Sequence, residues 1–253
     1  SILFNPDLTV IANASPFHLQ SFSLLAETGS AFFIEKPIAD SVNAALAMQK
    51  ISEIVTAPIM LGYNLRFSRS LQYLKRIVAS GVYGDVLSVS VDVGQSLSTW
   101  RKNDYRNSVS AQKHLGGGVL LELSHEFDYL NWLFGPLKCK FADVQKVSDL
   151  EIDVEDYASL QLFSLSNTPI RVTLDFFRAG QTRECTIHFG KASLKWEAID
   201  GSVSLLEDER RWTLLSKWEG DISMTYLREM EYFINCVSDN KIPDCSVAQG
   251  VQV

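Results

Sequence analysis

TVIANASPFH, residues 9–18, is the first of three stretches that decide the fold; AFFIEKPIADS (31–41) and IMLGYN (59–64) are the other two. Each contains an apolar run of the length expected for a buried strand. A helix is predicted to begin at Ser15-Pro16, where proline suits the first turn, and to end at Gly29. Asp40 and Ser41 are candidate caps of a second helix that runs to about residue 55. Strands alternating with helices in this way predict a parallel sheet with crossover helices.

Beyond residue 64 the pattern changes to strict alternation of apolar and polar residues. It is seen at 87–93, 172–176, 185–189 and 194–196, and it predicts a mainly antiparallel sheet with one wet or partner-covered face. Helices are predicted at about 67–80, 119–134 and 223–238. The predicted fold class is therefore α/β plus α+β: a partial Rossmann-type parallel sheet in residues 1–64, then a substrate-binding α+β domain with an open sheet in residues 65–253.

Composition excludes several classes of function. The 253 residues carry 23 basic and 30 acidic side chains, a net charge of −7, which disfavours a nucleic-acid partner. No apolar run approaches the ~18 residues that a membrane span needs, so no membrane partner is expected. The four cysteines lack zinc-site spacing and are expected to be free thiols in a reducing compartment. The first residues do not resemble a signal peptide, and a cytoplasmic location is expected.

Polar residues follow each predicted strand of the parallel sheet. Ligands of such sheets bind beyond the carboxyl ends of the strands. Lys36, held by the following proline, could donate to a substrate hydroxyl, or it could be a surface lysine paired with Glu35. His18 could contact a ligand as a neutral ring, or it could be a partly exposed histidine of a helix's first turn. The candidates at these strand ends are Asn13, Ser15, His18, Glu35, Lys36 and Asn64.

A second cluster is GGGVLLELSHEFDYLNWLFG, residues 116–135. The three glycines permit tight backbone geometry or close ligand approach. In one continuous helix, Glu122, Glu126 and Tyr129 would share a face with His125. We expect these neighbours to raise the basicity of His125 and to orient its ring, as a general base requires. The alternative is a solvated helix face with ordinary ion pairs. Because no H-E-x-x-H spacing is present, no metal site is expected.

A polar segment precedes this helix. Trp100-Arg101 and Asp104-Tyr105-Arg106 combine aromatic rings with guanidinium groups, which suits the binding of a sugar or an anionic group. The same residues are also compatible with a plain surface loop. Arg101, Tyr105 and Arg106 are therefore candidate substrate-binding residues, together with Glu122 and His125.

Taken in order, these stretches resemble the glucose–fructose oxidoreductase/inositol dehydrogenase (Gfo/Idh/MocA) family. The matching pieces are VIANASPFH, FFIEKPIADS, LGYNLRF, ASGVYGDV and W-R…D-Y-R…GGGVLLELSHEFDYL, which span residues 9–135. Any one of them is a weak signal, whereas the ordered set is specific. Residues 136–253 are compatible in pattern but carry no sharp motif.

The resemblance implies an NAD- or NADP-dependent oxidoreductase. Its expected reaction is hydride transfer at a hydroxyl-bearing carbon of a sugar, cyclitol or sugar nucleotide. Lys36 matches the active-site lysine of the family, and His125 matches its usual general acid/base. Ser15, His18 and Glu35 match positions that line the dinucleotide. The open sheet is expected to mediate a homodimer or homotetramer.

The sequence departs from the family in two respects. No G-x-G-x-x-G turn is present, so the N-terminal part of the Rossmann domain, roughly two βα units, is expected to be absent. Leu121 also stands four residues before His125, where the family commonly has Asp, and Glu122 lies three before. These departures leave open a truncated, non-catalytic fragment or a sugar-binding module. A glycosidase-like member that uses nicotinamide transiently is a further alternative.

Overall fold

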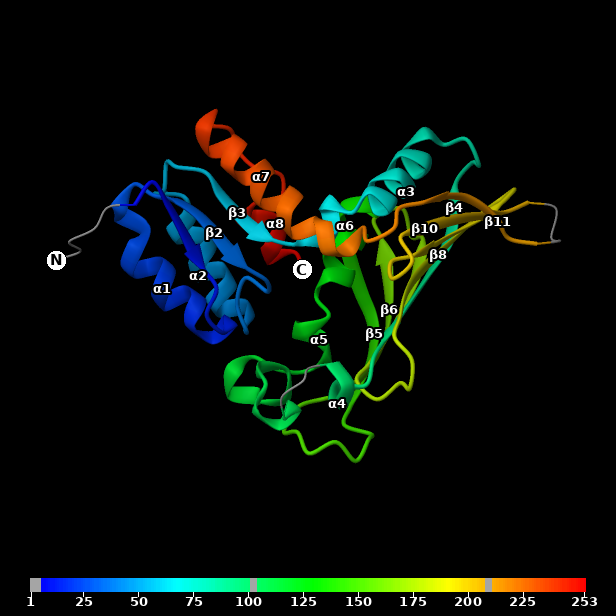
Figure 1. Cartoon of the computed structure of the whole chain (residues 1–253), viewed down its shortest axis with the longest axis horizontal. Coiled ribbons are helices and arrows are strands. Elements are labelled where there is room, and N and C mark those ends of the chain that lie inside the picture. Colours follow the sequence, from blue (N-terminus) through cyan, green and yellow to red (C-terminus); the bar gives the residue numbers. More distant parts are fainter. Residues whose placement is uncertain (1–5, 101–103, 208–210) are drawn as a thin grey trace.

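The molecule is built on two sheets joined by the polypeptide near residue 64 (Figure 1). The computed structural model describes residues 6–100, 104–207 and 211–253. Within these residues, a three-stranded parallel sheet belongs to the N-terminal part, and an eight-stranded mixed sheet forms the larger part. The predicted fold class is confirmed, and the likeness to solved structures described below agrees with it.

The small sheet has the order β1-β2-β3, with all strands parallel. Its strands are β1 (Leu8–Ile11), β2 (Ala31–Glu35) and β3 (Ile59–Gly62), and its crossover helices are α1 (His18–Leu25) and α2 (Val42–Ser52). Ile34 of β2 is in register with Ile11 on one side and Leu61 on the other. The three strands consequently end at the same edge, which places Lys36 beside the ends of β1 and β3.

The helix boundaries follow from local signals in the sequence. Ser41 caps α2 by accepting a hydrogen bond from the backbone N–H of Ala44 (3.4 Å). The predicted first helix is a 3₁₀ turn at Ser15–Phe17, then α1, then a second 3₁₀ turn that ends at Gly29 with a φ of +77°. A positive φ is readily adopted by glycine, which explains the stop.

The large sheet has the order β11-β10-β9-β8-β4-β7-β6-β5. All its neighbours are antiparallel except β4 and β7, which run parallel. The alternation seen in the sequence therefore predicted this sheet correctly. Its strands are β4 (Val86–Gly94), β5 (Leu137–Gln145), β6 (Tyr157–Ser164), β7 (Pro169–Asp175), β8 (Thr182–Phe189), β9 (Ser193–Glu197), β10 (Ser202–Leu206) and β11 (Thr213–Lys217).

Helices cover one face of this sheet and leave the other open (Figure 1). They include α3 (Arg69–Ser80), α5 (Val119–Glu122) and α6 (His125–Phe134), whereas α4 (Leu97–Trp100) is a single turn after β4. The helix predicted as continuous over 119–134 is broken at Leu123 and Ser124. Leu123 has φ −97° and ψ +29°, so the α-helical hydrogen-bond ladder stops and begins again at His125.

The C-terminal segment returns to the small sheet. The last helices are α7 (Thr225–Ser238) and α8 (Val247–Val251). Phe233 of α7 and Val247 of α8 share a core with β2 and β3, and the N–H of Leu61 donates to the Cys245 carbonyl (3.0 Å). Residues 225–253 thus complete the core beneath the parallel strands. The division into units at residue 64 remains a prediction.

The described residues offer neither a membrane-spanning helix nor a metal-binding cluster. No helix among them is long and apolar enough to cross a membrane. No group of three or more metal-ligating side chains occurs in the described part of the chain. Cys139, Cys185, Cys236 and Cys245 are free thiols, as the sequence predicted.

Candidate active site

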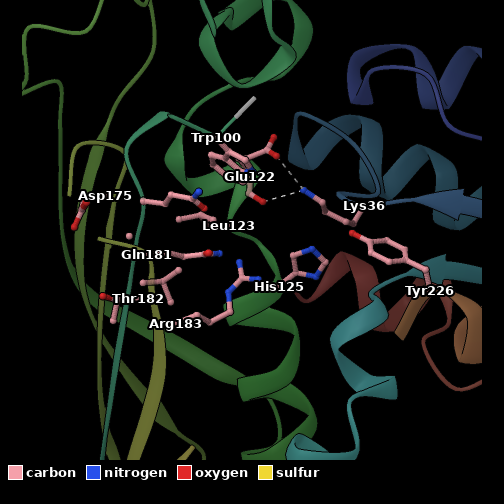
Figure 2. A pocket seen from close by; sticks show the side chains of 13 residues that line it. Lys36, Trp100, Glu122, Leu123, His125, Asp175, Gln181, Thr182, Arg183 and Tyr226 are labelled. Atoms are coloured by element: carbon pink, nitrogen blue, oxygen red, sulfur yellow. Dashed lines mark hydrogen bonds and ion pairs between the residues drawn. The ribbon is translucent and has the colours of Figure 1, made fainter. Parts of the chain in front are cut away.

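A cavity of about 260 Å³ lies between the end of β2, the start of α6 and the ends of β4 and β8. Ligand pockets commonly measure ~300–1,000 Å³, so this one suits a small molecule of about one sugar ring. Figure 2 shows the side chains of Lys36, Trp100, Glu122, His125, Arg183 and Tyr226 around it. The parallel sheet and the large sheet both contribute to its wall.

Lys36 reaches this cavity from the carboxyl end of β2. Its ammonium donates to the backbone carbonyl of Glu122 (2.9 Å) and lies 3.8 Å from the Glu122 carboxylate. Its side chain is 17% exposed, so most of its length is covered by protein. The alternative of a plain surface lysine is therefore wrong. Because the strand end is fixed by the sheet and the ammonium by Glu122, Lys36 has a defined position in the pocket.

His125 is the first residue of α6 and is 8% exposed. Its ring packs edge-on against Tyr63, with 5.7 Å between ring centroids. Among the described residues, nothing hydrogen-bonds its Nδ1. Burial, with the positive charges of Lys36 and Arg183 adding to it, holds the pKa of His125 well below its usual value. The imidazole is accordingly neutral near pH 7 and able to accept a proton.

This low pKa corrects the expectation that neighbouring acids would raise the basicity of His125. The expectation assumed one continuous helix, and the break at Leu123 and Ser124 removes it. Glu122 turns to Lys36, while Glu126 lies 3.0 Å from the guanidinium of Arg183. Glu122 nevertheless lines the pocket, and its role in substrate binding stays a prediction.

The glycine run before α5 permits a close approach of loops. A Cβ on Gly117 would clash with the carbonyl oxygen of Val109, and Gly116 abuts Ser15 in the loop after β1. The hydroxyl of Ser15 is buried and has no hydrogen-bond partner within the described residues. A polar ligand crossing the strand ends would find an unused donor there.

Several predicted cofactor residues are not part of the cavity wall. His18 is fully buried; its Nε2 lies 2.8 Å from the Asn13 carbonyl oxygen and its Nδ1 lies 3.2 Å from that of Ile38. The Asn13 side chain donates to Ser21 (3.0 Å), and that of Asn64 donates to Thr225 (2.7 Å). These contacts fix the strand-end loops, so the partly exposed His18 considered from the sequence is wrong.

Glu35 is partly buried beside the cavity. Burial raises the pKa of its carboxyl group, while the charges of Lys36 and His18 act in the opposite direction. Its carboxylate approaches Gly62 at the end of β3. It does not form an ion pair with Lys36 in the structure, which pairs Lys36 with Glu122 instead.

The predicted sugar-binding loop is arranged differently from the expectation. Arg106 forms ion pairs with Asp104 (2.8 Å) and Glu151 (2.9 Å) and is half exposed. The Tyr105 hydroxyl accepts from the backbone N–H of Glu151 (3.1 Å). Neither side chain belongs to the cavity wall, and Arg101 lies outside the described residues. The loop's contribution to the wall is Trp100.

Arg183 is the pocket residue that the sequence interpretation missed. It is the second residue of β8 and shares the parity of Cys185 and Ile187, whose side chains are buried beneath the helices. An arginine on the inward face of an alternating strand must find a partner or a ligand, since an unpaired buried charge is costly. That parity was visible in the sequence and is the signal that could have identified Arg183.

Comparison with known proteins agrees with the resemblance. Residues 71–195 match the model of the GFO/IDH/MocA C-terminal domain. An uncharacterized oxidoreductase of Synechocystis sp. is 25% identical over 189 residues, which cover 68% of this chain and 50% of that protein. D-apiose dehydrogenase of Paraburkholderia graminis is 25% identical over 206 residues, covering 81% of this chain and 52% of the enzyme. The chain thus spans about half the length of these relatives.

The likeness extends to solved structures. A levoglucosan dehydrogenase solved with NADH superposes with a TM-score of 0.83 at 18% identity, covering 96% of this chain and 74% of that one. At this identity the match shows a shared fold. The resemblance read from the ordered motifs is therefore confirmed, and residues 71–195 are similar to the GFO/IDH/MocA C-terminal domain.

Proposed function

We propose that the protein containing this chain is an NAD- or NADP-dependent oxidoreductase acting at a hydroxyl-bearing carbon of a sugar, cyclitol or sugar nucleotide. The observation that carries the proposal is the meeting of a neutral, buried His125 with a fixed Lys36 in one sugar-sized cavity. Lys36 follows a strand of the small sheet and His125 begins a helix that covers the large sheet, and a pocket at the carboxyl end of β2 is where ligands of parallel sheets bind.

His125 and Lys36 have distinct roles in this proposal. The substrate hydroxyl lies between them, and the imidazole accepts its proton as the carbonyl forms. The Lys36 ammonium donates a hydrogen bond to the same oxygen and opposes build-up of negative charge on it. The nicotinamide, when bound, supplies the hydride acceptor. Trp100 and Tyr226 contribute aromatic rings to the lining of the pocket.

The strand ends fit the nicotinamide part of such a cofactor. Ser15 offers a buried hydroxyl without a partner in the described structure, and Lys36 stands at the neighbouring strand end. Ser15, Glu35 and Lys36 are the residues we assign to its binding, whereas Asn13, His18 and Asn64 act indirectly by fixing the loops. The 253 residues contain no G-x-G-x-x-G turn, so the pyrophosphate must be bound by other means or other residues.

The relatives support this proposal. D-apiose dehydrogenase and levoglucosan dehydrogenase are named for oxidation of sugar-type molecules, and the latter was solved with NADH. The open face of the large sheet supports a homodimer or homotetramer. It presents Phe141, Gln161 and Arg171 to solvent, and a second copy could cover them.

The test is oxidation of a panel of sugars, cyclitols and sugar nucleotides by the full-length protein with NAD⁺ or NADP⁺, followed by absorbance of the reduced nicotinamide. His125→Asn should lower kcat about 10²- to 10⁴-fold, the usual contribution of a general base. Lys36→Met should also lower kcat. His114→Asn and Lys113→Met, in an exposed loop outside the pocket, are the matched controls.

The pH profile provides a second readout. Because the pKa of His125 lies well below its usual 6.5, kcat/KM for oxidation should hold its value as pH falls through 6.5 and decline only at lower pH. Sugar binding without nicotinamide binding in calorimetry would contradict the proposal and favour the sugar-binding module. Full activity of His125→Asn would show that another group accepts the proton.

A further inference from the structure

Arg183 stands on the wall of the cavity opposite the small sheet. It is in register with Val93 of β4, and its side chain lies on the helix-covered side of the large sheet. Figure 2 shows its guanidinium directed toward His125, and its charge is close enough to lower the pKa of that histidine. The cation therefore lies next to the group that would bind the reacting hydroxyl.

One edge of the guanidinium faces a buried acid. Arg183 Nε lies 3.0 Å from Oε1 of Glu126, whose side chain is 0% exposed. Arg183 itself retains 17% exposure. Within the described residues, Arg183 Nε and both carboxylate oxygens of Glu126 have no hydrogen-bond partner, so their contact is a close ion pair without hydrogen-bond geometry. The charge of Glu126 thus lies beside Nε, and the guanidinium lines the cavity.

Two other cations lie nearby, and each has a protein partner. The Lys36 ammonium donates to the Glu122 carbonyl. Arg178 lies between Asp92 and Asp175 and is satisfied by both carboxylates. Within the described wall of the pocket, Arg183 is the cation whose donors are arranged as a planar fork, whereas Lys36 is a point charge that shares its ammonium with Glu122. A planar group with two oxygens is the natural partner of such a fork, because two parallel N–H···O bonds can then form.

We propose that Arg183 determines the substrate specificity of the pocket by binding the carboxylate of a sugar acid, either a uronate or an aldonate. A hydroxyl of the same sugar acid, a few bonds from the carboxylate, is the group that reacts at His125. This rests on the function proposed above and narrows its substrate class. The cavity of about 260 Å³ suits one sugar ring and a carboxylate better than a nucleotide sugar. A carboxylate also adds a single negative charge next to Glu126, where a phosphate dianion would add more repulsion.

The experiment compares binding of matched sugars by calorimetry to the full-length protein. D-glucuronate and D-galacturonate are measured beside D-glucose and D-galactose, which differ from them only at C6, with D-gluconate as an aldonate and D-glucose 6-phosphate as the phosphate arm. A charge-assisted pair contributes enough for a preference of about 10- to 100-fold. We expect at least one sugar acid to bind that much more tightly than its neutral or phosphorylated counterpart.

Arg183→Gln should abolish this preference for the sugar acid over its neutral counterpart. Arg183→Lys, which keeps the charge and loses the fork, should retain part of it. Because Arg183→Gln leaves the Glu126 carboxylate without its partner, the double variant Arg183→Gln/Glu126→Gln keeps an uncharged pair of amides there and guards against misfolding. Arg106→Gln, an exposed arginine outside the pocket, is the control and should behave like the wild type.

Three results would overturn the proposal: no binding of any sugar acid at millimolar concentration, a preference for the neutral or phosphorylated sugars, or a preference that persists in both variants lacking the Arg183 charge. These readouts need no hydride transfer. A protein that binds sugar acids through Arg183 but reduces no nicotinamide would refute the proposed oxidoreductase function and leave the specificity of Arg183 standing.

Discussion

Replacing Asp128 with asparagine should destabilise the protein strongly. Asp128, on α6, accepts from Arg66 Nη2 at 2.6 Å and from Nε at 2.9 Å. The two side chains are 1% and 4% exposed. Arg66 lies in the 3₁₀ turn Asn64–Phe67, and its third nitrogen donates to Gln249 of the C-terminal segment (3.2 Å). The pair thus joins three parts of the fold one helical turn from His125.

The expected magnitude follows from the burial. Asparagine has nearly the same shape, but it cannot neutralise the guanidinium, and its amide N–H groups would face the Arg66 donors. Removing one partner of a buried ion pair costs about 3–5 kcal/mol. For a chain of this length, 1 kcal/mol corresponds to a change in Tm of about 2–4 °C, so Asp128→Asn should lower Tm by about 6–20 °C.

The assay is thermal unfolding followed by circular dichroism and repeated by calorimetry. Asp104→Asn, which alters an exposed ion pair with Arg106, should change Tm little, because exposed ion pairs contribute little. The double variant Arg66→Met/Asp128→Leu should recover much of the loss, since an apolar pair carries no desolvation cost. If Asp128→Asn lowered Tm by less than about 2 °C, the buried charge of Arg66 would have to be compensated in another way.

Two further predictions concern α7 and the open sheet face. Burial, with the charges of Glu35 and Asp128 adding to it, raises the pKa of Glu229 to about 9 from an ordinary 4.5. The contribution of Glu229 to the free energy of unfolding is therefore greatest below pH 4.5 and is lost as the pH rises toward 9. Glu229→Gln should therefore raise the urea midpoint of unfolding at pH 8 but not at pH 4. Glu231→Gln, which replaces an exposed acid on the same helix, should change the midpoint at neither pH. Equal effects of Glu229→Gln at both pH values would contradict the raised pKa of Glu229. Sedimentation velocity should show a dimer or tetramer that Phe141→Asp shifts toward monomer, and a wild-type monomer at micromolar concentration would rule out assembly through this face.

Local sequence patterns predicted most of the fold. The three apolar runs became β1–β3 because each is short, buried and followed by a cap or turn signal. Period-two alternation identified the large sheet, since one face of it must be covered by helices. Local periodicity does not predict the order of strands in a sheet. The parallel pairing of β4 with β7 brings together residues about 80 apart in sequence, and a local pattern carries no information on such contacts. The break before His125 was missed because the helical period continues through Leu123.

Among the predicted site residues, Lys36, Glu122 and His125 line one cavity in the structure, and their roles stay predictions. Lys36 and His125 were found because a lysine at a strand end and a histidine in a glycine-led helix are unusual placements for those residues. Arg106 was selected for its chemistry alone, and its acidic neighbours Asp104 and Glu151 satisfy it. The exposure of His18 was predicted from its position at the start of a helix. In the structure, two loops pack over His18 and bury its side chain.

The two edges of the small sheet differ in a way that limits what can join it. At β3 the backbone N–H of Leu61 is already taken by the carbonyl of Cys245, so the returning C-terminal segment blocks that side. At the other side β1 pairs, among the described residues, with β2 alone, and the side chain of Val10 is 51% exposed. A further strand can therefore join the small sheet only beside β1. Its carboxyl end would lie on the far side of β1 from Lys36, so it would leave the mouth of the pocket unobstructed.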